Sequence, residues 1–471
     1  MAKETNIIKR GLTNISYTFA AQIVNLLVSL IKVLWIPKLI GINEFSYWQL
    51  YVFYSSYVGF FQFGLNDGIY LRYGGKNYKD LDEKLFRSQF WLLTFSQFII
   101  ALVIMVYASS FSTDRGYILK VTSLSLVISG IASFFWFVLQ GTNRIKEYAL
   151  VLLVEKILFL ISVLILSFYQ VSSFTPFMIA DVSSKIVSLV VCIILGRNLV
   201  FGRIAKLGQA IRESLSNMSV GIKLMIANIS SMLILGVGRY VIDITWGVKV
   251  FGEFSLTLSV ISMVLLFINA ISVVLFPALR KVSLNELSKT YISLKTLLMI
   301  ILLSILILYI PLKSFLNIWF PEYKTSIKYL CILLPLCVFD GKMQMLVATY
   351  LKVIRREGKL LIINIISVIL SAGLCLFAAL VLNKVILVII SMVIAVGIRC
   401  LIAELYLASQ LKISLIRNII FEILLIGLFM ITAWFYDSWL STFIYGILYF
   451  VYIYLIKNDM KTTFKLIKLS K

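Results

Sequence analysis

The sequence contains no histidine, and its 471 residues include only 6 prolines and 5 cysteines. The absence of histidine excludes the commonest metal ligand and any proton relay built on imidazole. The cysteines fall inside apolar runs without metal-type spacing, so we interpret them as small apolar side chains. They are Cys192, Cys331, Cys337, Cys375 and Cys400. The "GGK" at 74–76 lacks the Gly-x-x-x-x-Gly-Lys-Ser/Thr frame of a phosphate-binding loop. The sequence therefore predicts no metal and no cofactor.

Apolar side chains are abundant instead: they make up 61% of the chain, whose mean hydropathy is +1.00. No soluble domain carries such a composition, because its surface must stay hydrated. Apolar runs of about 20 residues, each long enough to cross a hydrocarbon core of about 30 Å, recur along nearly the whole chain. None resembles a cleaved signal peptide. The fold class predicted is an all-α polytopic membrane protein.

We predict about fourteen transmembrane helices from these runs. They lie near 12–36, 45–66, 89–110, 118–139, 149–169, 174–196, 217–241, 251–276, 291–311, 326–350, 359–382, 385–407, 418–436 and 440–456. The stretch "GINEFSYWQLYV" (41–52) aligns with "GVKVFGEFSLTL" (247–258) in the same orientation, which indicates a repeat. Such a repeat predicts two parallel six-helix lobes around a central cavity. The predicted parts are the lobes 1–196 and 217–407, an extra helix pair at 418–456 and a basic tail at 457–471.

Lysine and arginine number 44 against 21 aspartate and glutamate residues, a net charge of +23. With the N-terminus in the cytoplasm, most of these bases lie in inner segments such as 72–87, 352–359 and 457–471, as the positive-inside rule requires. The charge therefore indicates orientation, with both termini cytoplasmic, and no nucleic acid. Outer connections are short, the longest near 313–326. Membrane polysaccharide polymerases usually carry paired acids on large outer loops, so we expect that the protein is not an enzyme.

The sequence of the first predicted hairpin is similar to that of a known protein family. "IPKLIGINEFSYWQLYVFYSSYVGFFQFGLNDGIYLRYG" (36–74) resembles that of polysaccharide-type flippases, the Wzx-like branch of the multidrug/oligosaccharidyl-lipid/polysaccharide exporter superfamily. Lys38, Gly41, Glu44, Phe45 and Gly64 match, whereas Ser46 replaces the usual Gly and Ile40 the usual Leu. Segments 139–150, 251–281 and 348–359 also fit.

The resemblance implies a flippase that works by alternating access in the bacterial inner membrane. Its cargo would be an undecaprenyl-pyrophosphate-linked oligosaccharide, an O-antigen or capsule repeat unit. A polysaccharide polymerase and a chain-length regulator are the implied protein partners, beside membrane lipids. A major-facilitator transporter is the main rival, although "GLNDGIYLRYGGK" (64–76) lacks the Asp-Arg-x-Gly-Arg cluster of that class. Lipid II flippases and cation-coupled drug antiporters remain open, but exporters of organic cations need acids in the cavity, and these spans hold more bases.

Basic residues inside the predicted spans need an explanation, because a charge at the bilayer centre costs about 2.5–3.5 kcal/mol on insertion scales. They are Lys32, Lys120, Lys156, Lys185, Lys223, Arg239, Lys295, Lys328, Lys342 and Arg399. Lys120, Lys295 and Lys328 lie near a span end, so we expect them to snorkel to the interface.

Spacing predicts how some of these bases are paired. Asp181 and Lys185 share a helical face and should form an ion pair. Glu155 and Lys156 are adjacent and point about 100° apart, so we expect each to pair with other helices. Asp340 and Lys342 lie about 200° apart and cannot share a face.

Lys32 precedes Gly41 by nine residues and Arg239 precedes Gly247 by eight, which puts one cation at similar depth in each half. We predict that they bind the pyrophosphate of the cargo, unless Lys32 snorkels outward. The full set of candidate cargo-binding residues is Lys32, Arg239, Lys342, Lys223 and Lys120. Uphill transport needs a coupled ion, H⁺ or Na⁺. The intramembrane carboxylates are Glu155, Asp181, Asp340, Glu404 and Glu422; the ion-coupling candidates are Asp340, Glu155 and Asp181.

Overall fold

The computed structural model describes residues 23–279, 284–457 and 460. These residues form helices joined by short connections, with no strand among them. The chain divides into two compact units, Met1–Ile229 (unit 1) and Ser230–Lys471 (unit 2). The division falls inside one long helix, and the predicted lobe bounds stay a prediction.

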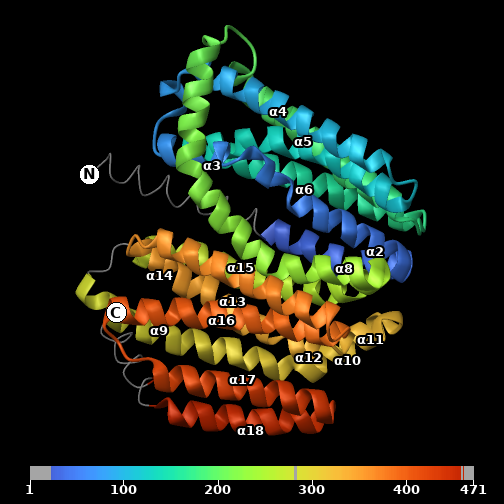
Figure 1. Ribbon diagram of the computed structural model, residues 1–471, viewed down its shortest axis with the longest axis vertical. Coiled ribbons are helices and arrows are strands. Elements are labelled where there is room, and N and C mark those ends of the chain that lie inside the picture. The colour runs from blue at the N-terminus through green and yellow to red at the C-terminus, as the bar shows by residue number, and fades with distance from the viewer. Residues whose placement is uncertain (1–22, 280–283, 458–459, 461–471) are drawn as a thin grey trace. The chain divides into compact units, whose positions relative to one another are not determined.

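Unit 1 begins, within the described residues, with a helix over Ile23–Leu34. It continues with α2 (Ile36–Ser56), α3 (Leu65–Tyr73), α4 (Glu83–Ser109), α5 (Asp114–Gly141), α6 (Ile145–Phe168), α7 (Phe174–Leu195) and the first part of α8 (Leu207–Leu279), as Figure 1 shows. The start of α4 is fixed by Asp82, whose carboxylate accepts hydrogen bonds from the backbone N–H groups of Lys84 and Leu85. Such a cap satisfies donors that the first helical turn leaves unpaired.

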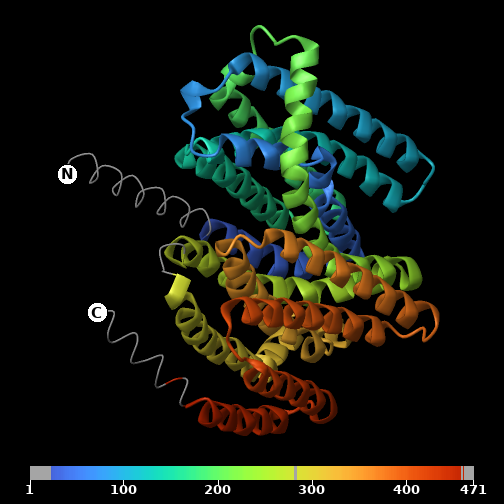
Figure 2. The same cartoon turned by 60° about the vertical axis from the view of Figure 1, so that its left-hand side comes forward.

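Unit 2 contains the remainder of α8 and the helices that follow it. They are α9 (Leu284–Ile305), α10 (Tyr309–Trp319), α11 (Lys324–Ile327), α12 (Leu330–Leu333), α13 (Pro335–Lys342), a π-helical turn (Met343–Val347), α14 (Ala348–Val353), α15 (Glu357–Leu380), α16 (Val385–Leu411), α17 (Ile416–Tyr436) and α18 (Trp439–Leu455). Helices α17 and α18 lie side by side within unit 2 (Figures 1 and 2). The extra helix pair predicted at the C-terminus is thus docked on this unit: Tyr445 and Tyr449 donate hydrogen bonds to the carbonyls of Leu303 and Ile300.

The backbone confirms the predicted equivalence of Gly41 and Gly247. Gly41 has φ 71° and ψ 175°, Gly247 has φ 85° and ψ 174°, and each interrupts a helix. This combination of angles is essentially open to glycine alone. Two stretches about two hundred residues apart therefore make the same turn for the same physical reason.

Within the described residues, ten helices are long and apolar enough to cross a membrane, or up to eleven if the pair Ile23–Leu34 and Ile36–Gln62, bent by 64°, is one span. The helix Trp439–Leu455 is apolar but shorter. The prediction of about fourteen spans is higher because it divides the chain at Gly41 and Gly247 and counts the short helix Trp439–Leu455 as a span. Residues 12–22 of its first span and most of the predicted tail 457–471 lie outside the described residues. In the structure, α8 covers both 217–241 and 251–276, and its helical geometry is broken between them at Gly247.

Large apolar side chains cover the outer faces of several helices. On α4, Phe95, Leu102 and Val106 are each more than 60% exposed, as are Phe435 on α17 and Phe443 on α18. Such continuous apolar surface suits contact with lipid rather than with water. The chain is therefore a multi-pass membrane protein, as the composition predicts.

The first part of α8 is held tightly against α3 within unit 1. A Cβ atom added at Gly68 would lie 1.9 Å from the carbonyl oxygen of Asn217, and one at Gly221 would lie 2.0 Å from that of Gly64. Small residues let two helix backbones approach this closely. Arg72 adds an ion pair with Glu213 at 2.8 Å and donates a hydrogen bond to Asn217 at 2.5 Å.

The hydroxyl of Tyr73 also donates to Glu213, at 2.7 Å. Burial, reinforced by the hydrogen bond to this carboxylate, raises the pKa of Tyr73 to about 12, so the phenol keeps its proton. The α3–α8 contact is thus fixed by both close packing and paired polar groups.

Candidate functional site

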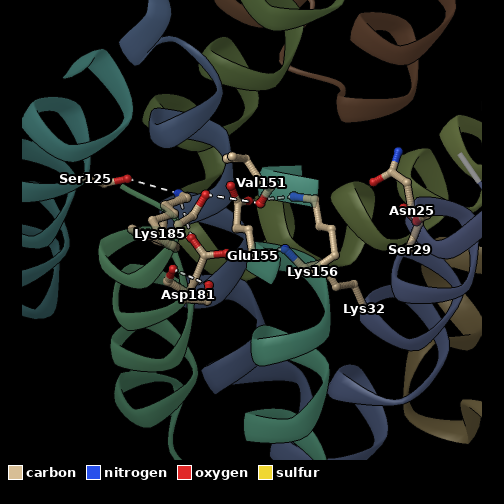
Figure 3. Close-up of polar contacts among 12 residues, drawn as sticks. Asn25, Ser29, Lys32, Ser125, Val151, Glu155, Lys156, Asp181 and Lys185 are labelled. Carbon is tan, nitrogen blue, oxygen red and sulfur yellow. Dashed lines mark hydrogen bonds and ion pairs between the residues drawn. The ribbon is translucent and has the colours of Figure 1, made fainter. Parts of the chain in front are cut away.

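A group of charged side chains lies inside the helices of unit 1. The unit 1 cluster, as we name it, consists of Lys32, Glu155, Lys156, Asp181 and Lys185 (Figure 3). The helix Ile23–Leu34 supplies Lys32, α6 supplies Glu155 and Lys156, and α7 supplies Asp181 and Lys185. Residues far apart in the sequence thus meet at one place.

Asp181 is the centre of the unit 1 cluster. Its carboxylate pairs with Lys185 at 2.7 Å and with Lys32 at 3.4 Å, and it accepts a hydrogen bond from the Tyr51 hydroxyl at 2.9 Å. Lys185 also donates to Ser125 at 3.0 Å. The predicted pair of Asp181 and Lys185 is confirmed, and one acid is shared by two lysines.

Lys32 is directed toward α6 and α7. Its ammonium lies 4.1 Å from the ring centroid of Phe159 and 5.9 Å from that of Trp48. Aromatic faces attract a cation electrostatically, which partly replaces the water it has lost. The side chain still keeps 28% of its surface exposed, whereas Asp181 keeps 10%. Lys32 can therefore meet an anion from outside the cluster.

Glu155 and Lys156 pair with each other at 2.8 Å, so the expectation that any pairing would be with other helices is wrong. The two Cβ atoms diverge, but the four-carbon stem of lysine is long and flexible enough to bend back to the carboxylate. The pair keeps Glu155 buried and Lys156 27% exposed. The cluster now holds three lysines against two carboxylates, which leaves one cation without an acid of its own.

A second group lies inside unit 2, on helices α9, α13, α16 and α17. We call it the buried tetrad, and its members are Lys295, Lys342, Glu404 and Glu422. Lys342 lies 2.6 Å from Glu404 and 2.8 Å from Glu422, and Lys295 lies 2.7 Å and 3.1 Å from the same two residues. No member exceeds 3% side-chain exposure. The tetrad is balanced in charge and closed to solvent.

The tetrad corrects the expectation that Lys295 snorkels to the interface. Its position one turn from the predicted span start permits that route, but α9 faces α13, α16 and α17, and the two glutamates hold the ammonium inside. Lys328 is exposed, as expected of a snorkelling residue, and its ammonium lies 4.8 Å from the ring centroid of Trp434. Both lysines lie within about one turn of a predicted span start, so sequence position does not separate them, whereas their packing does.

Arg399 forms a further buried group in unit 2. It pairs with Asp340 at 3.3 Å and donates to Asn364 and Ser231, each at 2.9 Å. Asp340 is thus directed toward α16 at Arg399, while Lys342 is directed toward the two glutamates. The prediction that Asp340 and Lys342 do not share a face is confirmed.

The other predicted site residues lie apart from these clusters. Arg239 donates to the hydroxyl of Ser255 at 3.1 Å, and its guanidinium lies 5.1 Å from the ring centroid of Phe251. Lys223 is exposed and Lys120 is half-buried. The assignments of Lys32, Arg239, Lys342, Lys223 and Lys120 to cargo and of Asp340, Glu155 and Asp181 to ion coupling stay predictions.

Three aromatic residues around Lys32 and Asp181 do not follow from sequence reasoning: Trp48, Tyr51 and Phe159. Aromatic side chains make up 14% of the chain, so no single one is distinctive. The available signal is that Trp48 and Tyr51 lie three residues apart on one face of α2. Among the described residues, no group of three or more Cys, Asp or Glu side chains is arranged to hold a metal ion.

Comparison with known proteins identifies the family and the fold of the chain. The family model described as polysaccharide biosynthesis protein matches residues 12–283, more than half of the chain. No curated protein sequence matches it significantly. Among solved structures, the inward-facing conformation of a multidrug resistance MATE family transporter of the MOP superfamily aligns with a TM-score of 0.66 at 13% identity, covering 83% of this chain and 98% of that one.

Two further structures have the same fold. The lipid II flippase MurJ in an inward closed conformation aligns with a TM-score of 0.62 at 14% identity and covers 95% of this chain and 99% of that one. A MOP superfamily transporter from Pyrococcus furiosus, described as having a binding pocket of reverse polarity, gives 0.54 at 14% identity, with 86% and 95% covered. The chain therefore belongs to the polysaccharide biosynthesis protein family and is a multi-pass membrane protein with the fold of MOP superfamily transporters.

Proposed function

We propose that the protein is a flippase that moves an undecaprenyl-pyrophosphate-linked oligosaccharide, an O-antigen or capsule repeat unit, from the cytoplasmic to the outer leaflet of a bacterial inner membrane by alternating access. The unit 1 cluster is the observation that carries the proposal. A member of a polysaccharide biosynthesis family holds, inside its helices, an accessible group of three lysines with only two acids. That charge suits an anionic cargo.

The geometry suggests how the cluster would hold and release a pyrophosphate. Asp181 pairs with both Lys32 and Lys185. Phosphate oxygens would take the place of this carboxylate on the exposed side of Lys32, with charge-assisted hydrogen bonds of the same kind. Asp181 would then compete for the lysines again, which favours release of the cargo. Lys342 is not part of this proposal, because two glutamates enclose its ammonium.

Other elements of the proposal rest on sequence grounds. Arg239 is the second cargo-binding base, and Lys223 and Lys120 are further candidates. The coupling ion is H⁺ or Na⁺, with Asp340, Glu155 and Asp181 as the candidate carriers. Both termini are cytoplasmic, and a polysaccharide polymerase and a chain-length regulator are the proposed protein partners.

Export measurements on Lys32 variants test the proposal. A charge-assisted contact is worth roughly 1.5–3 kcal/mol, so Lys32→Gln should weaken cargo binding about tenfold or more. Surface polysaccharide should fall sharply at unchanged protein level, whereas Lys32→Arg should keep more export because it retains the charge. Lys328→Gln, which changes an exposed lysine of unit 2, is the matched control. Normal export by Lys32→Gln at native expression would contradict the proposal.

A lipid II cargo is the second candidate, because the lipid II flippase MurJ covers 95% of this chain. The same variants distinguish the two. Loss of surface polysaccharide with normal growth supports an oligosaccharide cargo, whereas loss of viability with cell-wall defects supports lipid II.

A further inference from the structure

A polar cavity of about 460 Å³ lies in unit 2, where α9 begins and where α14 and α16 end. The residues around it are Leu287, Ser288, Ile354, Arg356, Gln410, Leu411 and Lys412. The hydroxyl of Ser288 donates to the carbonyl of Leu411 at 2.9 Å and so ties α9 to the end of α16. Among the lining residues, Leu287 is buried, while Arg356 and Lys412 are exposed.

The repeat allows Arg356, which lines this cavity, to be compared with an equivalent residue of unit 1. The turn before α15 and the turn before α6 have the same hydrogen bonds: the N–H of Arg356 donates to the carbonyl of Leu351 at 2.7 Å, and the N–H of Arg144 donates to that of Leu139 at 2.8 Å. The residue before each arginine is left-handed, with φ 56° at Arg355 and 59° at Asn143. Arg356 and Arg144 are therefore equivalent positions of the two units.

The two arginines differ in their partners. Arg144 pairs with Glu147 at 3.1 Å and lies over the ring of Tyr78 at 4.4 Å. The position equivalent to Glu147, three residues after Arg356, holds Lys359. Among the described residues no carboxylate pairs with Arg356, not even the adjacent Glu357. In unit 1 a glutamate thus neutralises the arginine of this turn, whereas in unit 2 the position of that glutamate holds a second basic residue.

The usual electrostatic role of a helix end does not explain Arg356. It stands at the N-terminus of α15, which has no side-chain cap, and a cation is unfavourable at that positive end of the helix dipole. An anion there would pair with the arginine and with unsatisfied backbone N–H groups.

Lys412, which also lines the cavity, follows α16 in a left-handed conformation (φ 54°) that glycine would adopt more easily. The sequence nevertheless places a lysine there. The cavity is therefore lined by two basic residues, Arg356 and Lys412, which would both attract an anion.

We propose that this cavity binds the phosphate group of a membrane lipid, with Arg356 and Lys412 as its ligands and Leu287 and Ile354 against the start of the lipid chain. Basic pockets between transmembrane helices recognise anionic headgroups in this way. The phosphate could belong to a bulk phospholipid or to a lipid-linked pyrophosphate. The inference does not depend on the cargo proposed above, since it concerns a different part of the chain.

Native mass spectrometry of the purified full-length protein tests this site, with phosphatidylglycerol and phosphatidylcholine as probes. Arg356→Gln and Lys412→Gln should each weaken phosphatidylglycerol binding about fivefold, and should leave phosphatidylcholine binding unchanged. Arg144→Gln, the equivalent position whose charge is already paired, should bind as the wild type does. Since both cavity side chains are exposed, Arg356→Gln and Lys412→Gln should elute as the folded protein, and the elution of Arg144→Gln is measured beside them.

Equal phosphatidylglycerol binding by the wild type and both cavity variants overturns the proposal. So does an equal loss in Arg144→Gln, because the effect would then report general surface charge. Inorganic pyrophosphate, added as competitor, distinguishes the two sources of the phosphate. Displacement of the lipid supports a site for lipid-linked pyrophosphate, and retention supports a site for bulk phospholipid.

Discussion

The unit 1 cluster and the buried tetrad of unit 2 both place lysines and carboxylates inside the membrane-spanning helices, but they differ in balance and in access. In unit 1, Lys32 and Lys156 keep 28% and 27% of their side-chain surface exposed, and lysines outnumber acids. In unit 2, two lysines meet two glutamates, and Lys342 keeps 3% exposed. A group that is open and unbalanced can exchange a partner for a ligand. A closed, neutral group is better suited to holding helices together.

The buried tetrad shows why charges are retained where no ligand reaches them. Each of its four residues comes from a different helix, and Glu422 comes from α17, in the helix pair outside the repeat. A buried ion group of this kind costs desolvation energy and specifies one arrangement of its helices. We therefore interpret the tetrad as the element that fixes α17 against α9, α13 and α16.

The largest expected effect is that of Glu422→Gln. The variant leaves two buried lysines with one glutamate, and breaking a buried pair in this way costs about 3–5 kcal/mol. Mixed-micelle unfolding titrations with sodium dodecyl sulfate measure the loss. Asp181→Asn is the matched variant in unit 1 and should cost less, because water can reach the lysines it leaves unpaired. Equal losses in the two variants would show that access to solvent does not distinguish the two groups.

The next effect compares the two units through their shared turn. Gly41→Ala and Gly247→Ala force a side chain into a backbone region that costs on the order of 1–3 kcal/mol. Since the two glycines have nearly the same φ and ψ, the two losses should agree. The same unfolding titration measures them, with Gly427→Ala as a control in an ordinary helical position with open space around it. If only one of the two variants lost stability, the two turns would share their backbone angles but not their energetic cost.

These glycines also show what the sequence could predict. The repeat, the helical fold and the pair of Asp181 and Lys185 depend on local spacing, which a sequence displays directly. The partners of Lys295 and Lys32 depend on which helices pack together, and spacing says nothing of that. The pairing of Glu155 with Lys156 was missed for another reason: a rigid helical projection ignores the reach of a lysine side chain.

A smaller effect is expected when both partners of a buried pair are removed together. Lys342→Met with Glu422→Leu leaves Lys295 and Glu404 as a neutral pair at 2.7 Å. Replacement of a buried ion pair by apolar residues of similar size is often neutral or even stabilising, so the double variant should recover most of the stability that Glu422→Gln loses. It should also export polysaccharide, since the tetrad is proposed to hold helices and not cargo. A double variant that is stable but inactive would assign the tetrad a direct role in transport.

The smallest effect belongs to Lys328. Sequence position alone puts Lys328 and Lys295 in one class, yet Lys328 is exposed beside Trp434 while Lys295 is enclosed by two glutamates. An exposed cation over an aromatic ring is worth about 0.5–1 kcal/mol, so Lys328→Gln should lower the free energy of unfolding by no more than that. Lys295→Gln leaves two buried carboxylates with one lysine and should cost about 3 kcal/mol or more. Unfolding titrations of the two variants side by side therefore separate snorkelling from burial. If both variants unfold like the wild type, Lys295 is not held inside by Glu404 and Glu422, and the closed character of the tetrad is wrong.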